Sequence, residues 1–307
     1  MERLDGGAAV PAPYRGGIVA LGNFDGFHAG HQAVVGRAVA RARAEDRPAL
    51  VATFDPHPAR FFRPDLPPFS LTDMDQRQEL LAEAGVDAML VFHFDAAFAA
   101  VTGPEFVTDH LVSRIDAAGV VTGEDFTFGK GRSGDIEALK LLGQANLMSV
   151  DIATPVTDED GVISSTRIRE ALKVGDCATA TRLLTRPFAI RGVVEHGDKR
   201  GRELGFPTAN MGLGDYLRPR FGVYAVRATL PDGTVRNGVA NLGIRPMFAD
   251  GRELLETWLF DFDGDLYGQC LEVALIAHLR DEQAFDGVEA LVAQVRRDAD
   301  EARRLLA

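Results

Sequence analysis

This chain has few cysteines, and the continuous apolar runs in its sequence are short. Two cysteines among 307 residues, Cys177 and Cys270, are too few for a disulfide framework or a cysteine metal site. Low cysteine usage is typical of a reducing compartment. No run approaches the ~18 apolar residues of a membrane-spanning helix, and the first residues lack the apolar core of a signal peptide. We therefore expect a cytoplasmic protein without a membrane partner.

Basic residues are outnumbered by acidic ones. The 33 lysines and arginines against 45 aspartates and glutamates give a net charge of −12. This charge argues against nucleic acid as a partner, yet it permits anionic substrates, because the field at a site is local. Hydrophobic residues make up 46% and charged residues 25%, as in ordinary globular proteins. A chain of this length has room for two domains.

Apolar runs and helical stretches alternate over the first half of the chain. We expect strands at 17–21, 49–54, 88–93 and 119–122, and helices at 32–44, 73–84, 103–115 and 135–145. Alternation at this spacing favours an α/β fold with a doubly wound parallel sheet. Ligands of such sheets bind at the carboxyl ends of the strands.

The pattern changes near residue 186 to short strand-like runs separated by turns. These runs occupy 190–195, 223–229, 236–241, 256–261 and 271–277, and a charged helix at 287–306 ends the chain. The pattern predicts an antiparallel β-barrel with a terminal helix. The expected domains are therefore 1–185 and 186–307.

The segment Gly22-Asn23-Phe24-Asp25-Gly26-Phe27-His28-Ala29-Gly30-His31 joins the first strand to the first helix. Its histidines lie at i and i+3 in the first helical turn, so both rings share one face. The free amides and dipole of the helix favour a phosphate there, and the glycines let it approach the backbone. A metal pair is the alternative, but no third ligand follows at a suitable spacing. The motif predicts a nucleotide site that includes Gly22, Asn23, Asp25, His28 and His31.

Hydroxyl side chains followed by an arginine open another helix, at Ser164-Ser165-Thr166-Arg167. Hydroxyls, amides and a guanidinium suit the β- and γ-phosphates of a nucleotide. An ordinary helix start with a surface arginine is the alternative.

Two other loops also follow predicted strands. The loop at 123–130 lacks the spacing and the hydroxyl residue of a P-loop. Within it, Asp125 is a candidate for hydrogen bonds to a ligand, whereas Phe126 and Phe128 have the period-two spacing of core aromatics. His57, between two prolines, either contacts a ligand or is structural.

Glycine and basic residues crowd the segment 197–210. Gly197, Gly201 and Gly205 permit close approach to phosphates, and Lys199 adds positive charge. Thr208 and Asn210 alternate on one side of an extended segment, so their oxygens suit Mg²⁺ or a phosphate. A solvated basic hairpin is the alternative.

Glu256 interrupts an apolar strand-like run at 254–259. It is either an outward-facing strand residue or a general base in a partly dry site. The aspartates at 261, 263 and 265 imitate a calcium loop, but Leu266 stands where that loop requires glycine.

Taken together, these strings resemble the bacterial bifunctional riboflavin kinase/FAD synthetase family over about residues 17–304. The first string is similar to the signature of HxGH nucleotidyltransferases. Further matches include Gly205-Phe206-Pro207-Thr208-Ala209-Asn210, Gly222-Val223-Tyr224 and Asp265-Leu266-Tyr267-Gly268. The resemblance implies that the barrel phosphorylates riboflavin with ATP to give FMN. It also implies that the α/β domain adenylylates FMN with a second ATP, which gives FAD and pyrophosphate.

The resemblance also implies roles for single residues. Asn23, His28 and His31 would face the α-phosphate and the leaving pyrophosphate, and Ser164, Ser165, Thr166 and Arg167 would hold the β/γ end. The candidates for flavin contacts are Asp125, Phe126, Phe128 and His57. In the kinase, Thr208 and Asn210 would bind Mg²⁺ and ATP, the loop at 197–205 would cover the nucleotide, and Glu256 would be the general base.

Two residues close to the kinase motifs depart from the family pattern. Trp258 stands where a histidine is usual, and Met247 stands where a threonine is usual. Two rival hypotheses therefore stay open: an enzyme with a working adenylyltransferase and a barrel that only binds flavin, or a flavin sensor without turnover. The oligomeric state is not predicted.

Overall fold

The computed structural model describes residues 1–196, 201, 204–244 and 252–307. The chain forms two compact units, one of residues 1–66 and 74–164 and the other of residues 67–73 and 165–307. Helices α7 (Ser165–Lys173) and α8 (Cys177–Leu184) thus belong to the same unit as the C-terminal strands. The expected boundary between catalytic domains at 185/186 stays a prediction.

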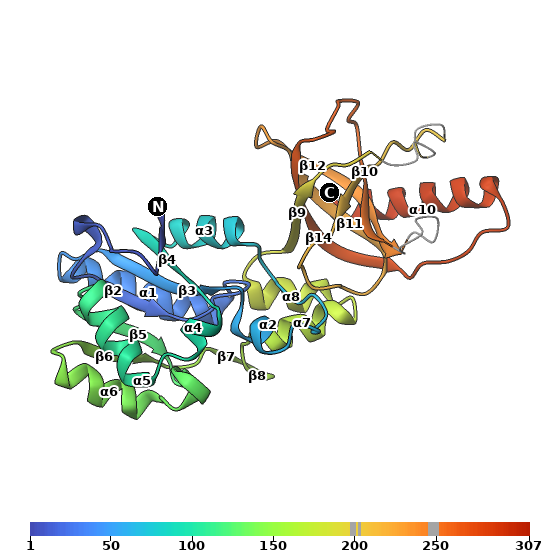
Figure 1. The fold of residues 1–307 in the computed structure, drawn as a ribbon. Coiled ribbons are helices and arrows are strands. Elements are labelled where there is room, and N and C mark those ends of the chain that lie inside the picture. Colours follow the sequence, from blue (N-terminus) through green and yellow to red (C-terminus); the bar gives the residue numbers. More distant parts are fainter. Residues whose placement is uncertain (197–200, 202–203, 245–251) are drawn as a thin grey trace. The chain divides into compact units, whose positions relative to one another are not determined.

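The first unit contains a six-stranded parallel sheet with the order β1-β4-β3-β2-β5-β6 (Figure 1). Its strands are β1 (Glu2–Asp5), β2 (Ile18–Leu21), β3 (Ala49–Asp55), β4 (Ala88–His93), β5 (Gly119–Gly123) and β6 (Ser149–Ala153). The chain runs from β2 to β3 on one side and later to β5 on the other side. The strand order therefore reverses at β2, which is where ligands of such sheets bind. The predicted doubly wound fold is confirmed.

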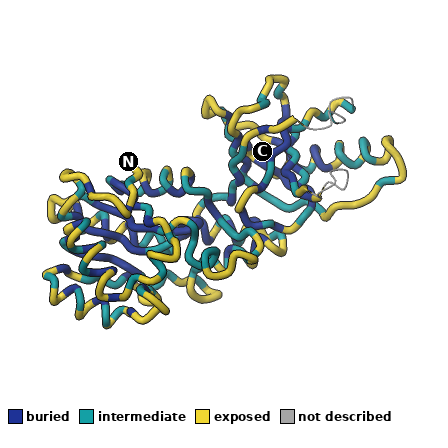
Figure 2. Tube along the Cα trace, viewed as in Figure 1, coloured by how far each residue is buried: buried dark blue, intermediate teal, exposed yellow. Residues whose placement is uncertain are grey.

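Helices cover both faces of this sheet. Val35 of α1 (Ala29–Ala44) and Leu81 of α3 (Met74–Glu83) pack into the core of one face. Leu111 of the π-helical segment η2 (Phe106–Arg114) and Leu139 of α6 (Ile136–Ala145) pack into the other. Figure 2 shows the central strands of this unit buried. The shorter elements are η1 (Ala12–Tyr14), α2 (Pro58–Phe62), α4 (Ala96–Ala99), α5 (Gly103–Glu105), η3 (Lys130–Arg132) and the hairpin β7 (Thr157–Asp158) with β8 (Gly161–Val162).

The second unit is built on a six-stranded antiparallel sheet with the order β10-β13-β12-β11-β14-β9. Its strands are β9 (Phe188–Val193), β10 (Ala209–Gly212), β11 (Gly222–Thr229), β12 (Val235–Ile244), β13 (Glu253–Leu259) and β14 (Cys270–Arg280). A bridge between Glu195 and Asn210 joins the two edges, so the sheet forms a nearly closed barrel. Helix α10 (Val288–Leu306) packs Ala299 and Ala302 against Val223 and Val239 on the outer face of the sheet. The predicted barrel and terminal helix are confirmed.

A short segment from the first half of the chain, residues 67–73, packs within the second unit. Ser70 forms a parallel bridge with Tyr216, and the Tyr216 hydroxyl donates to Asp73 Oδ2 at 2.9 Å. Arg169 of α7 donates from Nε to the carbonyl of Phe69 at 2.9 Å. The sequence pattern does not indicate this segment. Within the described parts of the chain, no helix is both long and apolar enough to cross a membrane.

Candidate active sites

The turn after β2 is held by buried aromatic side chains. Phe24 and Phe27 are 1% and 4% exposed, and both adopt positive φ, at 51° and 40°. Gly26 between them has a φ of 83°, which glycine adopts without strain. The buried rings anchor a backbone that L-residues rarely adopt. Burial of these rings thus fixes the shape of the loop that carries the HxGH motif.

His28 lies at the N-cap of α1, because the helix begins at Ala29 and not at residue 32 as the pattern predicted. His28 Nδ1 accepts a hydrogen bond from the backbone N–H of His31 at 3.3 Å, and the two rings stack at 3.7 Å between centroids. An accepting Nδ1 places the proton of the neutral ring on Nε2. The expectation that both histidines lie inside the first turn is therefore wrong for His28. Its side chain therefore accepts from the His31 amide, one of the helix N-terminal amides that we expected to bind phosphate.

A buried arginine supports the same turn. Arg77 Nη2 of α3 lies 3.5 Å from Asp25 Oδ1, and both side chains are at least nine-tenths buried. Thr53 Oγ1 donates to the carbonyl of Asn23 at 3.0 Å. The side-chain oxygen Oδ1 of Asn23 is buried and has no hydrogen-bond partner among the described residues. The sequence pattern misses Arg77, since its residue type and position resemble those of any surface helix residue.

Two glycines of the motif leave little room for a side chain. A Cβ on Gly22 would lie 3.0 Å from the ring of Phe24, and a Cβ on Gly30 would lie 3.1 Å from the ring of His28. The Gly30 Cβ would also lie 3.2 Å from the carbonyl oxygen of Ile163. These glycines therefore preserve the ring positions of the motif in addition to allowing a ligand to approach.

The other two loops at this edge of the sheet differ in what they expose. His57 caps α2, with Nδ1 accepting from the N–H of Ala59 at 3.1 Å. Asp125 is exposed beside β5. Phe126 stacks on Phe128 at 5.8 Å, and Phe128 is buried in the core at 6% exposure. Asp125 and the half-buried Phe126 thus have surface that a ligand can reach, and the flavin contacts of all four residues stay predictions.

An aromatic cluster near the carboxyl ends of β3 and β4 was not singled out from the sequence. Phe61 contacts Phe94 at 5.4 Å, and Phe62 contacts both rings at 5.2 and 5.8 Å. Phe62 is 63% exposed, which is unusual for so large an apolar side chain. The exposed ring gives this edge of the sheet a flat apolar surface.

The Ser164–Arg167 string spans the point where the two units meet in sequence. Ser164 ends the first unit, and α7 begins at Ser165, so Thr166 and Arg167 belong to the second unit. The role of these residues as the far end of a triphosphate site stays a prediction.

A cavity of about 490 Å³ lies in the second unit, between the outer face of the barrel and α10. Glu256, Thr208, Asn241 and Arg280 supply polar groups to its wall. Its apolar wall includes Phe206, Trp258, Phe285, Leu291 and Val295. An apolar cavity with a few convergent polar groups is typical of a small-molecule site.

Strand register explains why these polar groups converge. Asn210 lies directly opposite Glu256, which lies opposite Asn241. Asn241 lies opposite Val223, which in turn lies opposite Arg280. Directly paired residues point to the same face of a sheet. A single row therefore crosses five strands on the face that α10 covers, with Glu256 near one end and Arg280 at the other.

The end of the row at Asn210 has the oxygen atoms that Mg²⁺ prefers. Asn210 is 5% exposed, and its Oδ1 has no hydrogen-bond partner among the described residues. Thr208 lines the cavity two residues earlier. Among the described residues no three His, Cys, Asp or Glu side chains gather as metal ligands. The assignment of Mg²⁺ to the oxygens of Thr208 and Asn210 stays a prediction.

The glycine-rich loop is described only in part. Gly201 approaches the chain closely, because a Cβ there would lie 2.5 Å from the carbonyl oxygen of Phe206. Gly205 has a φ of +86°. Gly197 and Lys199, which the sequence also placed at the nucleotide, lie outside the described residues, as does Met247.

Trp258 occupies the wall of the cavity two residues after Glu256 on β13. Its ring contacts Phe206 at 4.8 Å and Phe260 at 5.4 Å. The guanidinium of Arg303 lies 4.2 Å from the Phe260 ring. Trp258 thus adds apolar surface to the cavity where the resemblance led us to expect a histidine.

Known proteins resemble the chain over nearly its whole length. The FAD synthetase family model matches residues 11–167, and the riboflavin kinase family model matches residues 184–306. The bifunctional riboflavin kinase/FMN adenylyltransferase of Escherichia coli strain K12 is 41% identical and covers 95% of this chain and 93% of its own. The protein of the same description from Bacillus subtilis is 37% identical and covers 94% of this chain and 92% of its own.

A solved structure has the same fold over 99% of both chains, with a TM-score of 0.87 and 33% identity. It is described as a macrolide-efflux protein from Streptococcus pneumoniae, and we take from it the shared fold alone. The FAD synthetase model matches the N-terminal part of the chain, and the riboflavin kinase model matches the C-terminal part. The curated relatives match across both parts. The chain therefore belongs to the family of bifunctional riboflavin kinase/FMN adenylyltransferases.

Proposed function

We propose that the second unit phosphorylates riboflavin with ATP to give FMN, and that the first unit transfers an adenylyl group from ATP to FMN. The observation that carries the kinase assignment is the pairing of Asn210 with Glu256, which lines the cavity. A carboxylate and an orphaned amide oxygen side by side meet the needs of phosphoryl transfer, which are a proton acceptor and a place for a cation.

In the kinase, Glu256 accepts the proton of the riboflavin 5′-hydroxyl. The hydroxyl oxygen then bonds to the γ-phosphorus of ATP while the bond to the ADP oxygen breaks. Thr208 and Asn210 would hold Mg²⁺, which when bound neutralises phosphate charge. The apolar wall with Trp258 and Phe206 excludes water, so hydrolysis of ATP competes less with transfer to the flavin.

In the adenylyltransferase, an FMN phosphate oxygen attacks the α-phosphorus of ATP, and pyrophosphate leaves. No covalent intermediate with the protein is needed, because positioning and charge neutralisation carry such a reaction. His28 donates from Nε2, since its Nδ1 is engaged by the His31 amide. Ser164, Ser165, Thr166 and Arg167 would bind the leaving pyrophosphate, and Gly22, Asn23 and Asp25 would shape the phosphate loop.

The flavin of the second reaction is assigned to the edge where β3, β4 and β5 end. The exposed ring of Phe62 supports this assignment, because an isoalloxazine ring stacks on flat apolar surfaces. Asp125 and Phe126 are further candidates, and Phe128 and His57 would act behind them. We place both reactions in the cytoplasm, where their product would be used.

One assay tests the proposal. The protein is incubated with riboflavin and Mg-ATP, and the flavins are separated by chromatography. Accumulation of FAD supports both assignments. Conversion of FMN to FAD with riboflavin left unreacted would leave the barrel as a flavin-binding module. Flavin binding without release of pyrophosphate or ADP would indicate a sensor.

A further inference from the structure

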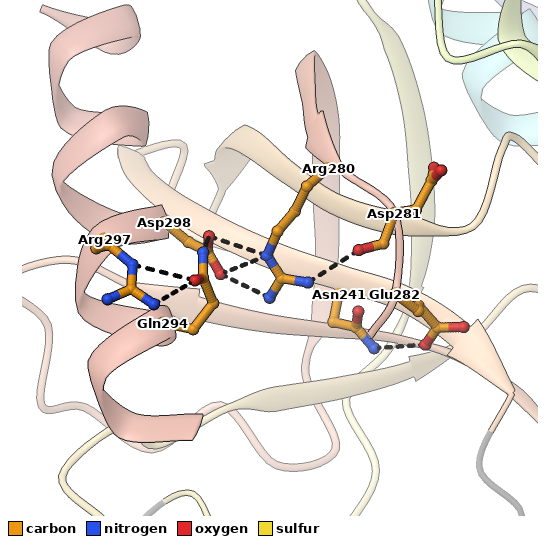
Figure 3. Close-up of polar contacts among 7 residues, drawn as sticks. All are labelled: Asn241, Arg280, Asp281, Glu282, Gln294, Arg297 and Asp298. Atoms are coloured by element: carbon orange, nitrogen blue, oxygen red, sulfur yellow. Dashed lines mark hydrogen bonds and ion pairs between the residues drawn. The ribbon is translucent and has the colours of Figure 1, made fainter. Parts of the chain in front are cut away.

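Arg280 lies at the end of the polar row farthest from Asn210, and its guanidinium is hydrogen-bonded to Asp298 of α10 (Figure 3). Its Nε donates to both carboxylate oxygens of Asp298, at 3.0 and 3.1 Å, and its Nη2 donates to Oδ2 at 2.8 Å. Its Nη1 donates to the backbone carbonyl of Asp281 at 2.9 Å. Three of the five N–H groups of an arginine side chain are thus engaged by described residues. The other two are available to a molecule in the cavity that Arg280 lines.

Asp298 is itself fixed from the other side. It is 6% exposed, and its Oδ1 accepts from Gln294 Nε2 at 2.7 Å. The orientation of the Gln294 amide is set in turn by Arg297, whose Nη2 donates to Gln294 Oε1 at 2.6 Å (Figure 3). One turn of α10 therefore presents a carboxylate in a single orientation. An arginine held on one edge in this way keeps its remaining donors in place without rotamer freedom to lose.

The distance from Glu256 defines what Arg280 can affect. The two residues are three strands apart, about 14 Å along the sheet at a strand spacing of about 4.8 Å. A phosphoryl group at Glu256 is out of reach of a guanidinium at that distance. The far end of a flavin whose 5′-hydroxyl lies at Glu256 is within reach. Arg280 thus belongs to substrate binding and not to the chemical step.

We infer that Asp298 is a positioning residue of the kinase site, which acts through Arg280 to set the affinity for riboflavin. This inference rests on the proposed kinase reaction. Asp298 also lines the cavity, but its two oxygens accept from Arg280 and Gln294, so we assign its effect on the substrate to Arg280. Loss of its charge would leave the guanidinium free to rotate and to form other contacts.

The test is Asp298→Asn, which preserves size and removes the charge. We expect the KM for riboflavin to rise about tenfold, as for the loss of one charge-assisted hydrogen bond. We expect kcat and the KM for ATP to change less than twofold. Fluorescence titration with riboflavin alone should show the same weakening. Asp298→Glu should restore part of the affinity. Adenylylation of added FMN should be unchanged.

Asp300→Asn is the matched control, since it removes the same charge from an exposed position two residues along α10. It should leave every kinetic constant as in the unaltered protein. Gln294→Met removes the hydrogen bond from Gln294 to Asp298 and keeps the carboxylate. We expect a smaller rise in the riboflavin KM than for Asp298→Asn. It also serves if Asp298→Asn does not fold, as judged by circular dichroism.

A double-mutant cycle decides whether Asp298 acts through Arg280. In an Arg280→Ala background, Asp298→Asn should cause no further loss of riboflavin affinity. Additive losses would overturn the inference, as would an unchanged riboflavin KM in folded Asp298→Asn. An equal fall in kcat and in ATP affinity would overturn it as well. Failure of the unaltered protein to phosphorylate riboflavin would instead refute the proposed function, so the two failures are distinct.

Discussion

Glu256 lies directly opposite Asn210 on the neighbouring strands β13 and β10, and both lie on the barrel face that α10 covers. The pairing brings an acidic side chain beside an amide oxygen that has no hydrogen-bond partner in the described part of the chain. Two of the predictions that follow depend on this pair.

Replacement of the carboxylate tests the general base. Glu256→Gln keeps the shape of the side chain and removes its ability to accept a proton. We expect the rate of FMN formation to fall by about 10²- to 10⁴-fold, whereas conversion of added FMN to FAD should be unchanged. Glu253→Gln, on the same strand, loses an ion pair with Arg218 and serves as the control. Similar loss of FMN formation in both variants would contradict the assignment.

The amide of Asn210 provides the second test. Asn210→Leu keeps the number and branching of the side-chain heavy atoms and removes the orphaned oxygen together with the amide nitrogen. We expect a several-fold rise in the Mg²⁺ concentration that gives half-maximal FMN formation. The Mg²⁺ dependence of FAD formation from FMN serves as the control within the same protein. An unchanged Mg²⁺ dependence of the kinase would show that the ion is held elsewhere.

The HxGH histidines should affect the other reaction alone. His28→Ala removes the N-cap acceptor of α1 and the Nε2 donor. We expect FAD formation from FMN to drop by at least about 10²-fold and FMN formation from riboflavin to continue. Loss of the cap should lower the unfolding free energy by about 1 kcal/mol, which thermal denaturation measures. If a folded variant lost both activities, the assignment of separate sites would be wrong.

Two glycines on α1 form a matched pair. A Cβ on Gly30 would press on the His28 ring, whereas no described atom lies within 4 Å of a Cβ on Gly36. Gly30→Ala should therefore reduce FAD formation, because the ring must move by a few tenths of an ångström. Gly36→Ala should keep the activity and raise the unfolding free energy by about 0.5–1 kcal/mol. Equal activities of the two variants would mean that the ring position is unimportant.

The two cysteines should differ in reactivity. Burial raises the pKa of the Cys177 thiol to about 11, so at pH 8.5 it stays protonated and shielded. Cys270 is exposed. Iodoacetamide at pH 8.5 should therefore alkylate Cys270 in the native protein and Cys177 only after unfolding, as peptide mass spectrometry would show. In Cys270→Ser, rapid native alkylation would argue against the burial of Cys177.

Periodicity predicted the central strands of the first sheet, and it missed the two edge strands β1 and β6. The central strands β2 to β5 lie within one or two residues of their expected positions. The edge strand β1 carries Glu2, Arg3 and Asp5, which are exposed, so its composition does not distinguish it from a loop. Helix α1 begins three residues early, because His28 acts as an N-cap, a role that sequence rules assign to Ser, Thr, Asp or Asn.

Candidate site residues could be proposed from the sequence where they lie in short contiguous motifs, as His28 and Thr208 do. Residues that act through long-range register were missed. Arg280 ends β14 and Asp298 lies on α10, 18 residues later in the sequence. Only the pairing of β14 with β11 and the packing of α10 on the sheet bring them to the cavity of Glu256. Phe62 was missed because its exposure, and not its residue type, makes it notable.

The segment 67–73 makes the chain cross between the two units three times instead of once. A fragment that begins at residue 165 would lack the partner that Ser70 offers to Tyr216 and the carboxylate of Asp73 that accepts from its hydroxyl. A fragment that ends at residue 164 would expose the same segment to solvent. Neither half of this protein is therefore a contiguous piece of its gene, and cutting the coding sequence once cannot release either half intact.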